Sequence, residues 1–157
     1  MMNSREIFSW MHRHPFLIIV GILVLIDFFL VMLTLASASK ELRVTFFDVG
    51  QGDAVLIEAP NGNQLLYDAG PPSGALVREL SRALPFWDRS IDVAVLSHPD
   101  ADHIGGFPDV FERYDISAVM TSGAQSDNGV YDKTEQSIRD EHAGHIIARK
   151  GMSIVLG

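Results

Sequence analysis

The segment that most constrains this chain runs from His98 to Gly106 and directly follows the apolar run Ile91–Ser97. A run of β-branched and small apolar residues predicts a buried strand, and the ends of such strands are where open α/β sheets place their chemistry. Two imidazoles and two carboxylates then follow within six residues: His98, Asp100, Asp102 and His103. The pattern predicts an α/β fold with a functional site at this edge of its sheet.

The side chains of this cluster favour a metal site. In an extended segment side chains alternate, so His98, Asp100 and Asp102 are expected on one face, with a turn bringing His103 beside them. The chain has no Cys, so any metal must be held by imidazole and carboxylate groups. The competing interpretation is a capped turn between a strand and a helix, which explains one or two acids but not two His as well.

Length and charge limit the function classes. The chain has 157 residues, which suffices for one domain plus an appendage, and its formal net charge is −8. A domain that follows a long phosphate backbone by charge alone needs clustered Lys and Arg, and the sequence shows no such cluster. If nucleic acid is the substrate, the metal must supply most of the attraction.

An apolar segment over residues 16–36 predicts a transmembrane helix, since about twenty apolar residues cross a bilayer. We therefore expect a short tail over 1–15, a linker over 37–42 and a domain over 43–157. A cleaved signal peptide is the alternative, because Ala36-Ser37-Ala38 resembles a cleavage site. An N-terminal anchor with a short leading end predicts a single-pass protein of the cell membrane whose domain is extracytoplasmic.

The rest of the chain reads as short strands that come to alternate with helices, which is typical of α/β and α+β domains. The expected strands form a β-meander over 43–48, 53–58 and 64–68, followed by 91–97, 116–120 and two short apolar stretches, 145–148 and 152–156, which place the end of the chain in a sheet. The expected helices cover 73–84, 107–114 and 132–143.

Three further groups of polar residues are candidates for the site. Asp68 ends a strand, and we weigh a turn-forming role equally with one in which its carboxylate orients a metal-binding imidazole. Asp48, Gln51 and Asp53 are read first as turn residues, with a loop that faces the substrate as the alternative. His142 and His145, spaced to share a helix face, are read first as a solvated helix end rather than as ligands.

Two stretches carry a family resemblance. The sequences FFDVGQGDAVLIEAPNGNQLLYDAG and VAVLSHPDADHIGGF resemble the metallo-β-lactamase superfamily, and within it the hydrolase domain of the ComEC-type DNA-uptake (competence) proteins. The resemblance extends from about residue 44 to about residue 121. It implies an αββα sandwich with two divalent metal ions at one edge.

Carried over position by position, the resemblance implies that His98 and Asp100 bind one metal while Asp102 and His103 bind the other. Asp102 would also be catalytic, because it can orient the attacking water. Asp100 stands where most of the superfamily has His, and this harder oxygen ligand makes Mn²⁺ a competitor of Zn²⁺. The family takes its remaining ligands from the second half of the domain, so this chain resembles the first half of an incomplete domain.

The resemblance implies a metal-dependent hydrolase that uses a hydroxide held by two metals, most plausibly a phosphodiesterase or nuclease linked to DNA uptake. One alternative is a catalytically incomplete, membrane-tethered binding module or a truncated fragment, for which a partner chain would cover the exposed half-sandwich. Another is a hydrolase of small substrates such as lactams or thioesters, since fold alone does not choose a reaction.

Overall fold

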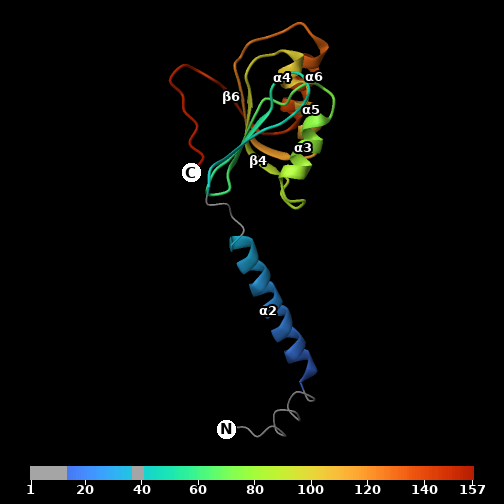
Figure 1. The fold of residues 1–157 in the computed structure, drawn as a ribbon, viewed down its shortest axis with the longest axis vertical. Coiled ribbons are helices and arrows are strands. Elements are labelled where there is room, and N and C mark those ends of the chain that lie inside the picture. Colours follow the sequence, from blue (N-terminus) through green and yellow to red (C-terminus); the bar gives the residue numbers. More distant parts are fainter. Residues whose placement is uncertain (1–13, 37–40) are drawn as a thin grey trace. The chain divides into compact units, whose positions relative to one another are not determined.

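The structure, a computed structural model, describes residues 14–36 and 41–157. The chain forms two compact units, residues 1–38 and residues 39–157 (Figure 1). Most of the predicted N-terminal tail, the first part of the predicted linker and the Ser and second Ala of the alternative cleavage site lie outside the described residues. The apolar helix belongs to the first unit and the predicted domain to the second.

Helix α2, Pro15–Ala36, coincides with the predicted transmembrane segment. Its 22 residues give a length of about 33 Å at 1.5 Å per residue, which matches the roughly 30 Å hydrocarbon core of a bilayer. Pro15 suits the first turn of a helix, where its missing N–H costs nothing. The helix has a mean hydropathy of 3.1 over Pro15–Thr34 and is long and apolar enough to cross a membrane; that it does so stays a prediction.

The second unit is built on one mixed sheet of six strands whose spatial order is the chain order. Strands β1 to β3 are antiparallel neighbours, and β3 to β6 run parallel to one another. The strands are β1 (Arg43–Phe46), β2 (Val55–Glu58), β3 (Gln64–Tyr67), β4 (Ser90–Leu96), β5 (Asp115–Thr121) and β6 (Gly144–Ile147). The predicted β-meander is confirmed, although its strands end before Asp48 and begin after Asp53.

Four helices lie on one face of this sheet (Figure 1). They are α3 (Ala75–Ala83), α4 (Ala101–Ile104), α5 (Phe107–Phe111) and α6 (Gly129–Asp140). Their apolar side chains form one core with those of the strands beneath, and Leu80, Phe107 and Val119 are fully buried in it. Helix α6 begins three residues earlier than predicted because the Asn128 side chain caps it, accepting a hydrogen bond from the Tyr131 N–H at 2.7 Å.

The opposite face of the sheet carries a row of apolar side chains that no described helix covers. The strand register places one residue of each strand in this row: Phe46, Val55, Tyr67, Val95, Met120 and Ile146. Phe46 is 78% exposed, and Tyr67 and Ile146 are 40% exposed. One sheet with helices on a single face corresponds to one α and one β layer of the predicted αββα sandwich.

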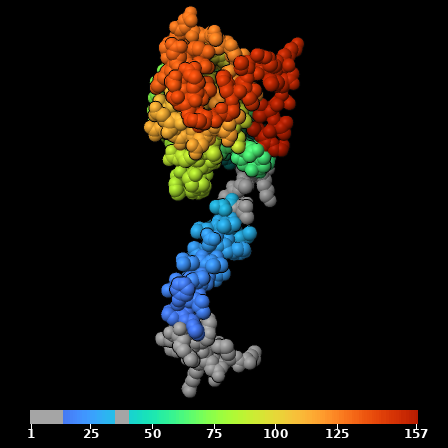
Figure 2. All heavy atoms as spheres, turned by 180° about the vertical axis from the view of Figure 1, so that it is seen from behind, coloured from blue at the N-terminus to red at the C-terminus, as the bar shows by residue number. Residues whose placement is uncertain are grey.

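The predicted strand over 152–156 is wrong. After β6 the chain turns at Gly151, whose φ of +93° is open to glycine, and the segment that follows pairs with no strand. It lies instead against the β2–β3 turn, where the side-chain amides of Asn61 and Asn63 donate to the Leu156 carbonyl at 2.7 and 2.8 Å. This segment is the red trace beside the sheet in Figure 1, and its atoms face the viewer in Figure 2.

Truncation of Phe107 tests where the core lies. Phe107 has no exposed surface, so Phe107→Ala should lower the free energy of unfolding of the second unit by about 3–5 kcal/mol through lost burial and the cavity left behind. Phe46→Ala, at an exposed phenylalanine of β1, should cost less than about 1 kcal/mol. Urea denaturation of the full chain in detergent, followed by circular dichroism, measures both. Equal losses would contradict this placement of the core.

Candidate metal centre

The predicted metal cluster lies where the carboxyl ends of β3 and β4 meet. These two strands are parallel neighbours, so the residues that follow them share one edge of the sheet. Asp68 follows β3, and the segment from Ser97 to Asp100 follows β4. Helix α4 then begins at Ala101, so the predicted extended conformation does not reach Asp102. Asp102 lies on the first turn of α4, because Asp100 takes the extended cap conformation and the chain turns helical after it.

The four predicted ligands come together as two pairs. His98 Nε2 lies 3.4 Å from Asp100 Oδ2, and His103 Nε2 lies 4.0 Å from Asp102 Oδ2. The centroids of the two imidazole rings are 3.9 Å apart. These are the pairs that the sequence resemblance implies for the two metals, although the distances alone do not assign ligands. His98, Asp100 and Asp102 are 44%, 66% and 49% exposed in their side chains, so the pairs are open to solvent.

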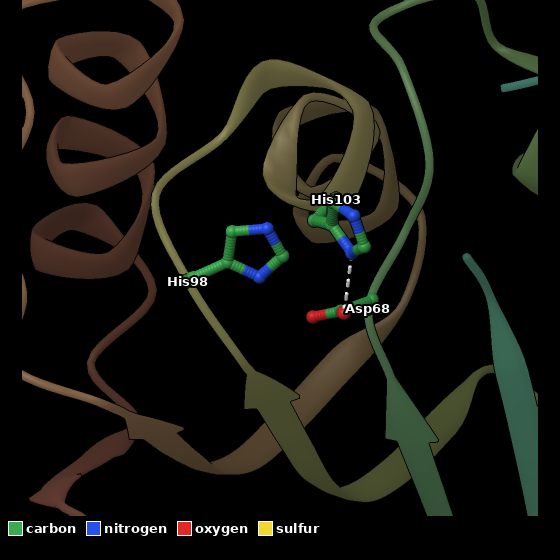
Figure 3. A group of neighbouring side chains, drawn as sticks. All are labelled: Asp68, His98 and His103. Carbon is green, nitrogen blue, oxygen red and sulfur yellow. Dashed lines mark hydrogen bonds and ion pairs between the residues drawn. The ribbon is translucent and has the colours of Figure 1, made fainter. Parts of the chain in front are cut away.

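Asp68 lies on the inner side of the two imidazoles. Its carboxylate is 1% exposed and accepts hydrogen bonds from the Ser97 N–H at 2.8 Å and from the Ser97 hydroxyl at 2.6 Å. His103 Nδ1 lies 2.9 Å from Asp68 Oδ2, the contact drawn as a dashed line in Figure 3. The backbone of Asp68 has φ +57°, a left-handed conformation that Asp tolerates better than most residues.

Donor atoms of Asp68, His98 and His103 lie within 4.8 Å of one another, so these three residues could also hold a single ion. The hydrogen bonds favour a different role for Asp68. Its two oxygens already accept three donors, and it has almost no exposed surface. A carboxylate in this position orients the imidazoles that bind a metal with their other nitrogen. These are the contacts that the orienting role requires, and that role of Asp68 stays a prediction.

The three residues of the predicted substrate loop have different surroundings. Asp53 Oδ2 is 3.9 Å from His103 Nδ1, so this carboxylate is beside the cluster. Asp48 accepts a hydrogen bond from the Gly50 N–H at 3.2 Å, which is the turn-forming role. Gln51 is exposed between them.

His142 and His145 do not join the cluster formed by Asp68, His98 and His103. His142 Nδ1 lies 2.8 Å from the Asp140 carbonyl, and His145 Nε2 lies 3.1 Å from the hydroxyl of Thr121 at the end of β5. Thr121, the contact of His145, lines a small cavity together with His98, but His145 itself is not part of that lining. The helix proposed to present both imidazoles on one face ends at Asp140, before either residue.

Sequence reasoning missed Ser97. Its side chain lies between Asp68 and His98, with Oγ 2.8 Å from His98 Nδ1. The available signal was a hydroxyl residue directly before the first His of the cluster, but at the end of an apolar run it reads as the last residue of a strand. The side chain of Asn128, which donates to the Pro99 carbonyl at 3.2 Å, is a second contact to the cluster that the sequence did not reveal.

The donor set fits divalent metal ions. Two imidazoles have Nδ1 in contact with protein groups and Nε2 beside a carboxylate, which leaves nitrogen and oxygen donors on the open side. Nitrogen donors suit Zn²⁺, and added carboxylates make the set acceptable to Mn²⁺.

Comparison with known proteins agrees with the geometry. The sequence profile of the metallo-beta-lactamase superfamily matches residues 47–127. Competence protein ComA of Neisseria gonorrhoeae is 39% identical over 72 residues, which are 46% of this chain and 10% of that protein. Recombination protein 2 of Haemophilus influenzae is 37% identical over 83 residues, which are 50% of this chain and 10% of that protein. The chain thus matches about a tenth of the length of these curated relatives.

Solved structures share the fold. A metallo-β-lactamase of Cronobacter sakazakii with a HARLDQ motif superposes with a TM-score of 0.52 at 22% identity, covering 73% of this chain and 46% of the other. Its S60 mutant gives a TM-score of 0.53 over the same shares. At this identity the likeness concerns the fold alone. The sequence profile, however, matches more than half of the chain and includes the whole His–Asp cluster, and the chain therefore belongs to the metallo-β-lactamase superfamily.

Proposed function

We propose that the second unit of this chain acts as a metal-dependent hydrolase linked to competence, with a phosphodiester of DNA as its substrate. The observation that carries the proposal is the arrangement of the two imidazoles. Each has a carboxylate next to Nε2, and the Nδ1 atoms are held from the side of the buried Asp68. Histidines that bind a catalytic metal are held in this way, by a second group on the other ring nitrogen.

In this proposal His98 and Asp100 hold one divalent ion, Zn²⁺ or Mn²⁺, and Asp102 and His103 hold a second. When bound, two such ions activate a water and neutralise charge on the phosphoryl oxygens of the substrate. Asp102 accepts a hydrogen bond from that water and so orients it, a role for which its half-exposed carboxylate is available. Each pair offers two donors, so further coordination positions are left for water, substrate or other ligands.

DNA is favoured as the substrate by the names of the two curated relatives, a competence protein and a recombination protein. The charge of the chain is consistent with DNA only if metal is bound, because a formal net charge of −8 repels a phosphate backbone. The proposal therefore includes strict metal dependence of DNA binding as well as of hydrolysis.

Two rival functions use the same fold. A hydrolase of lactams or thioesters would use the same metals on a neutral or singly charged substrate, and fold alone does not decide between them. A binding module without catalysis would hold metal and ligand but turn nothing over. Parallel assays of a phosphodiester, a lactam and a thioester with the same metal-loaded protein separate these functions.

We further propose that α2 anchors the chain in the cell membrane as a single span and that the second unit is extracytoplasmic. The length and composition of α2 support the span.

A glycine in the loop before β2, Gly52, lies directly against the main chain of Asp102. A Cβ atom on Gly52 would lie 1.7 Å from the Asp102 carbonyl oxygen, so only glycine permits this contact. Gly50 in the same loop also has a left-handed backbone, yet a Cβ there would meet nothing within 4 Å. Substitution of the two glycines by Ala therefore distinguishes the effect of backbone strain, which both variants have, from the effect of the contact with Asp102, which only the Gly52 variant has.

Asp102→Ala is expected to lower phosphodiester hydrolysis at least about 100-fold, since it removes both a metal donor and the group that orients the water. Turnover of bis(4-nitrophenyl) phosphate with added Mn²⁺ or Zn²⁺ measures the loss. Asp132→Ala, at an exposed acid of α6, is the control and should leave turnover unchanged. Circular dichroism should show that both variants fold. Wild-type turnover in Asp102→Ala would overturn the catalytic assignment.

Gly52→Ala is expected to weaken Zn²⁺ binding about 10-fold or more, because the added methyl group displaces the Asp102 backbone. Gly50→Ala has a similar conformational cost, about 1–2 kcal/mol, and should bind Zn²⁺ as the wild type does. Competition with a chromogenic chelator measures both affinities. Equal affinities of the two variants would show that the contact with Asp102 does not position the cluster.

The absence of Cys makes the membrane orientation directly testable. A Ser153→Cys variant carries one thiol on an exposed residue of the second unit. It should react with a membrane-impermeant maleimide in intact spheroplasts, whereas Ser4→Cys, before the helix, should react only after lysis. The reverse pattern would place the second unit in the cytoplasm.

A further inference from the structure

The Ser97 hydroxyl connects the buried Asp68 to His98. It lies 2.6 Å from Asp68 Oδ2 and 2.8 Å from His98 Nδ1, whereas the Ser97 main-chain N–H donates separately to Asp68 Oδ1 at 2.8 Å. Figure 3 shows Asp68 in contact with His103, with the His98 ring standing apart from the carboxylate. Asp68 thus reaches His103 directly and His98 only through Ser97.

The donor and acceptor inventory fixes the direction of these bonds. An ionised carboxylate only accepts hydrogen bonds, so the single hydroxyl proton of Ser97 goes to Asp68. The Ser97 oxygen must then accept from His98, which places the His98 proton on Nδ1. His103 likewise donates from Nδ1 to Asp68. In the neutral form of each ring Nε2 is then the unprotonated nitrogen, and these are the nitrogens that lie beside Asp100 and Asp102.

We propose that Ser97 is a positioning residue that extends the hold of Asp68 to His98, so that one buried carboxylate sets the tautomer of both metal-binding imidazoles. The inference rests on the proposed function, in that the two Nε2 atoms are taken to be metal donors. Loss of a group that orients a metal-binding histidine lowers metal affinity by about 10- to 100-fold.

A purely structural role of Ser97 is separable from this one. The main-chain N–H of Ser97 ties the end of β4 to Asp68 whatever the side chain is, and Ser97→Ala retains that bond. Ser97→Thr retains the hydroxyl as well. A serine at the other end of the same strand supplies the matched control, because the Ser90 hydroxyl also donates to a carboxylate, that of Asp88 at 3.1 Å, away from the cluster.

The test is made on the metal-free full chain in detergent micelles. Long-range proton–nitrogen NMR correlations of the imidazoles, at about pH 8.5 where an unperturbed imidazole is neutral, report which ring nitrogen carries the proton. His98→Gln and His103→Gln assign the signals. The wild type and Ser97→Thr should show His98 and His103 protonated on Nδ1. In Ser97→Ala, His98 should shift toward the Nε2–H tautomer while His103 is unchanged.

Zn²⁺ affinity, measured by competition with a chromogenic chelator, is the second readout. It should fall about 10- to 100-fold in Ser97→Ala, recover in Ser97→Thr, and be unaffected in Ser90→Ala. An Nε2-protonated His98 in the wild type, or unchanged tautomer and affinity in Ser97→Ala, would overturn the proposal. Neither readout requires turnover, so a chain that shows the expected tautomers but hydrolyses no phosphodiester would refute the proposed activity and leave the role of Ser97 intact.

Discussion

The buried carboxylate of Asp68 is the group on which the arrangement of this site depends. A carboxylate with 1% exposure is costly unless its oxygens are fully hydrogen-bonded, and here three donors meet that requirement. The main chain directly after Asp68 is also held by hydrogen bonds. Ala69 N–H donates to the His103 carbonyl at 2.7 Å, and Gly70 N–H donates to the Asp53 carbonyl at 2.9 Å. The β3–α3 connection, the loop before β2 and helix α4 therefore converge on one short stretch of backbone.

The inner and outer sides of the cluster differ in rigidity and in charge. On the inner side the imidazoles contact fixed partners, whereas on the outer side the Asp100 side chain is mostly exposed and that of Asp102 is half-exposed. Two exposed carboxylates in an acidic chain make this edge of the sheet repulsive to anions. Divalent cations reverse the local charge. In the proposed function, a phosphodiester is therefore attracted to this edge only when metal is bound.

The sequence predicted those parts of the fold that have strong local signals. Apolar runs bounded by turn residues located β2, β3 and β4, and the density of His and Asp located the cluster. The sequence did not predict that α4 begins at Ala101. An Asp that binds a metal and an Asp that caps a helix are the same residue type, so the sequence does not distinguish the two roles. It also gave no role to Ser97, whose contacts join residues that lie 29 positions apart in the chain. Such contacts exist only after β3 and β4 have paired.

The segment after β6 is a second case in which a contact between distant residues decides the structure, here against a predicted strand. Residues 152–156 have the composition of a strand, but local propensity cannot foresee that two side-chain amides of a distant turn hold the Leu156 carbonyl. Whether a short apolar run forms a strand depends on whether a neighbouring strand is available to pair with it.

The apolar row on the open face of the sheet has a thermodynamic consequence for the metal centre. Tyr67 directly precedes Asp68, and Val95 lies two residues before Ser97, so the strands that present this row also end in the groups that hold the imidazoles. Anything that binds the paired strands on this face, and not the unfolded chain, stabilises that pairing by mass action. Linkage between two binding sites is reciprocal. A ligand on this face would therefore raise the affinity of the metal centre for metal, and bound metal would raise the affinity of the face for that ligand, to the extent that both need the same strand ends in register.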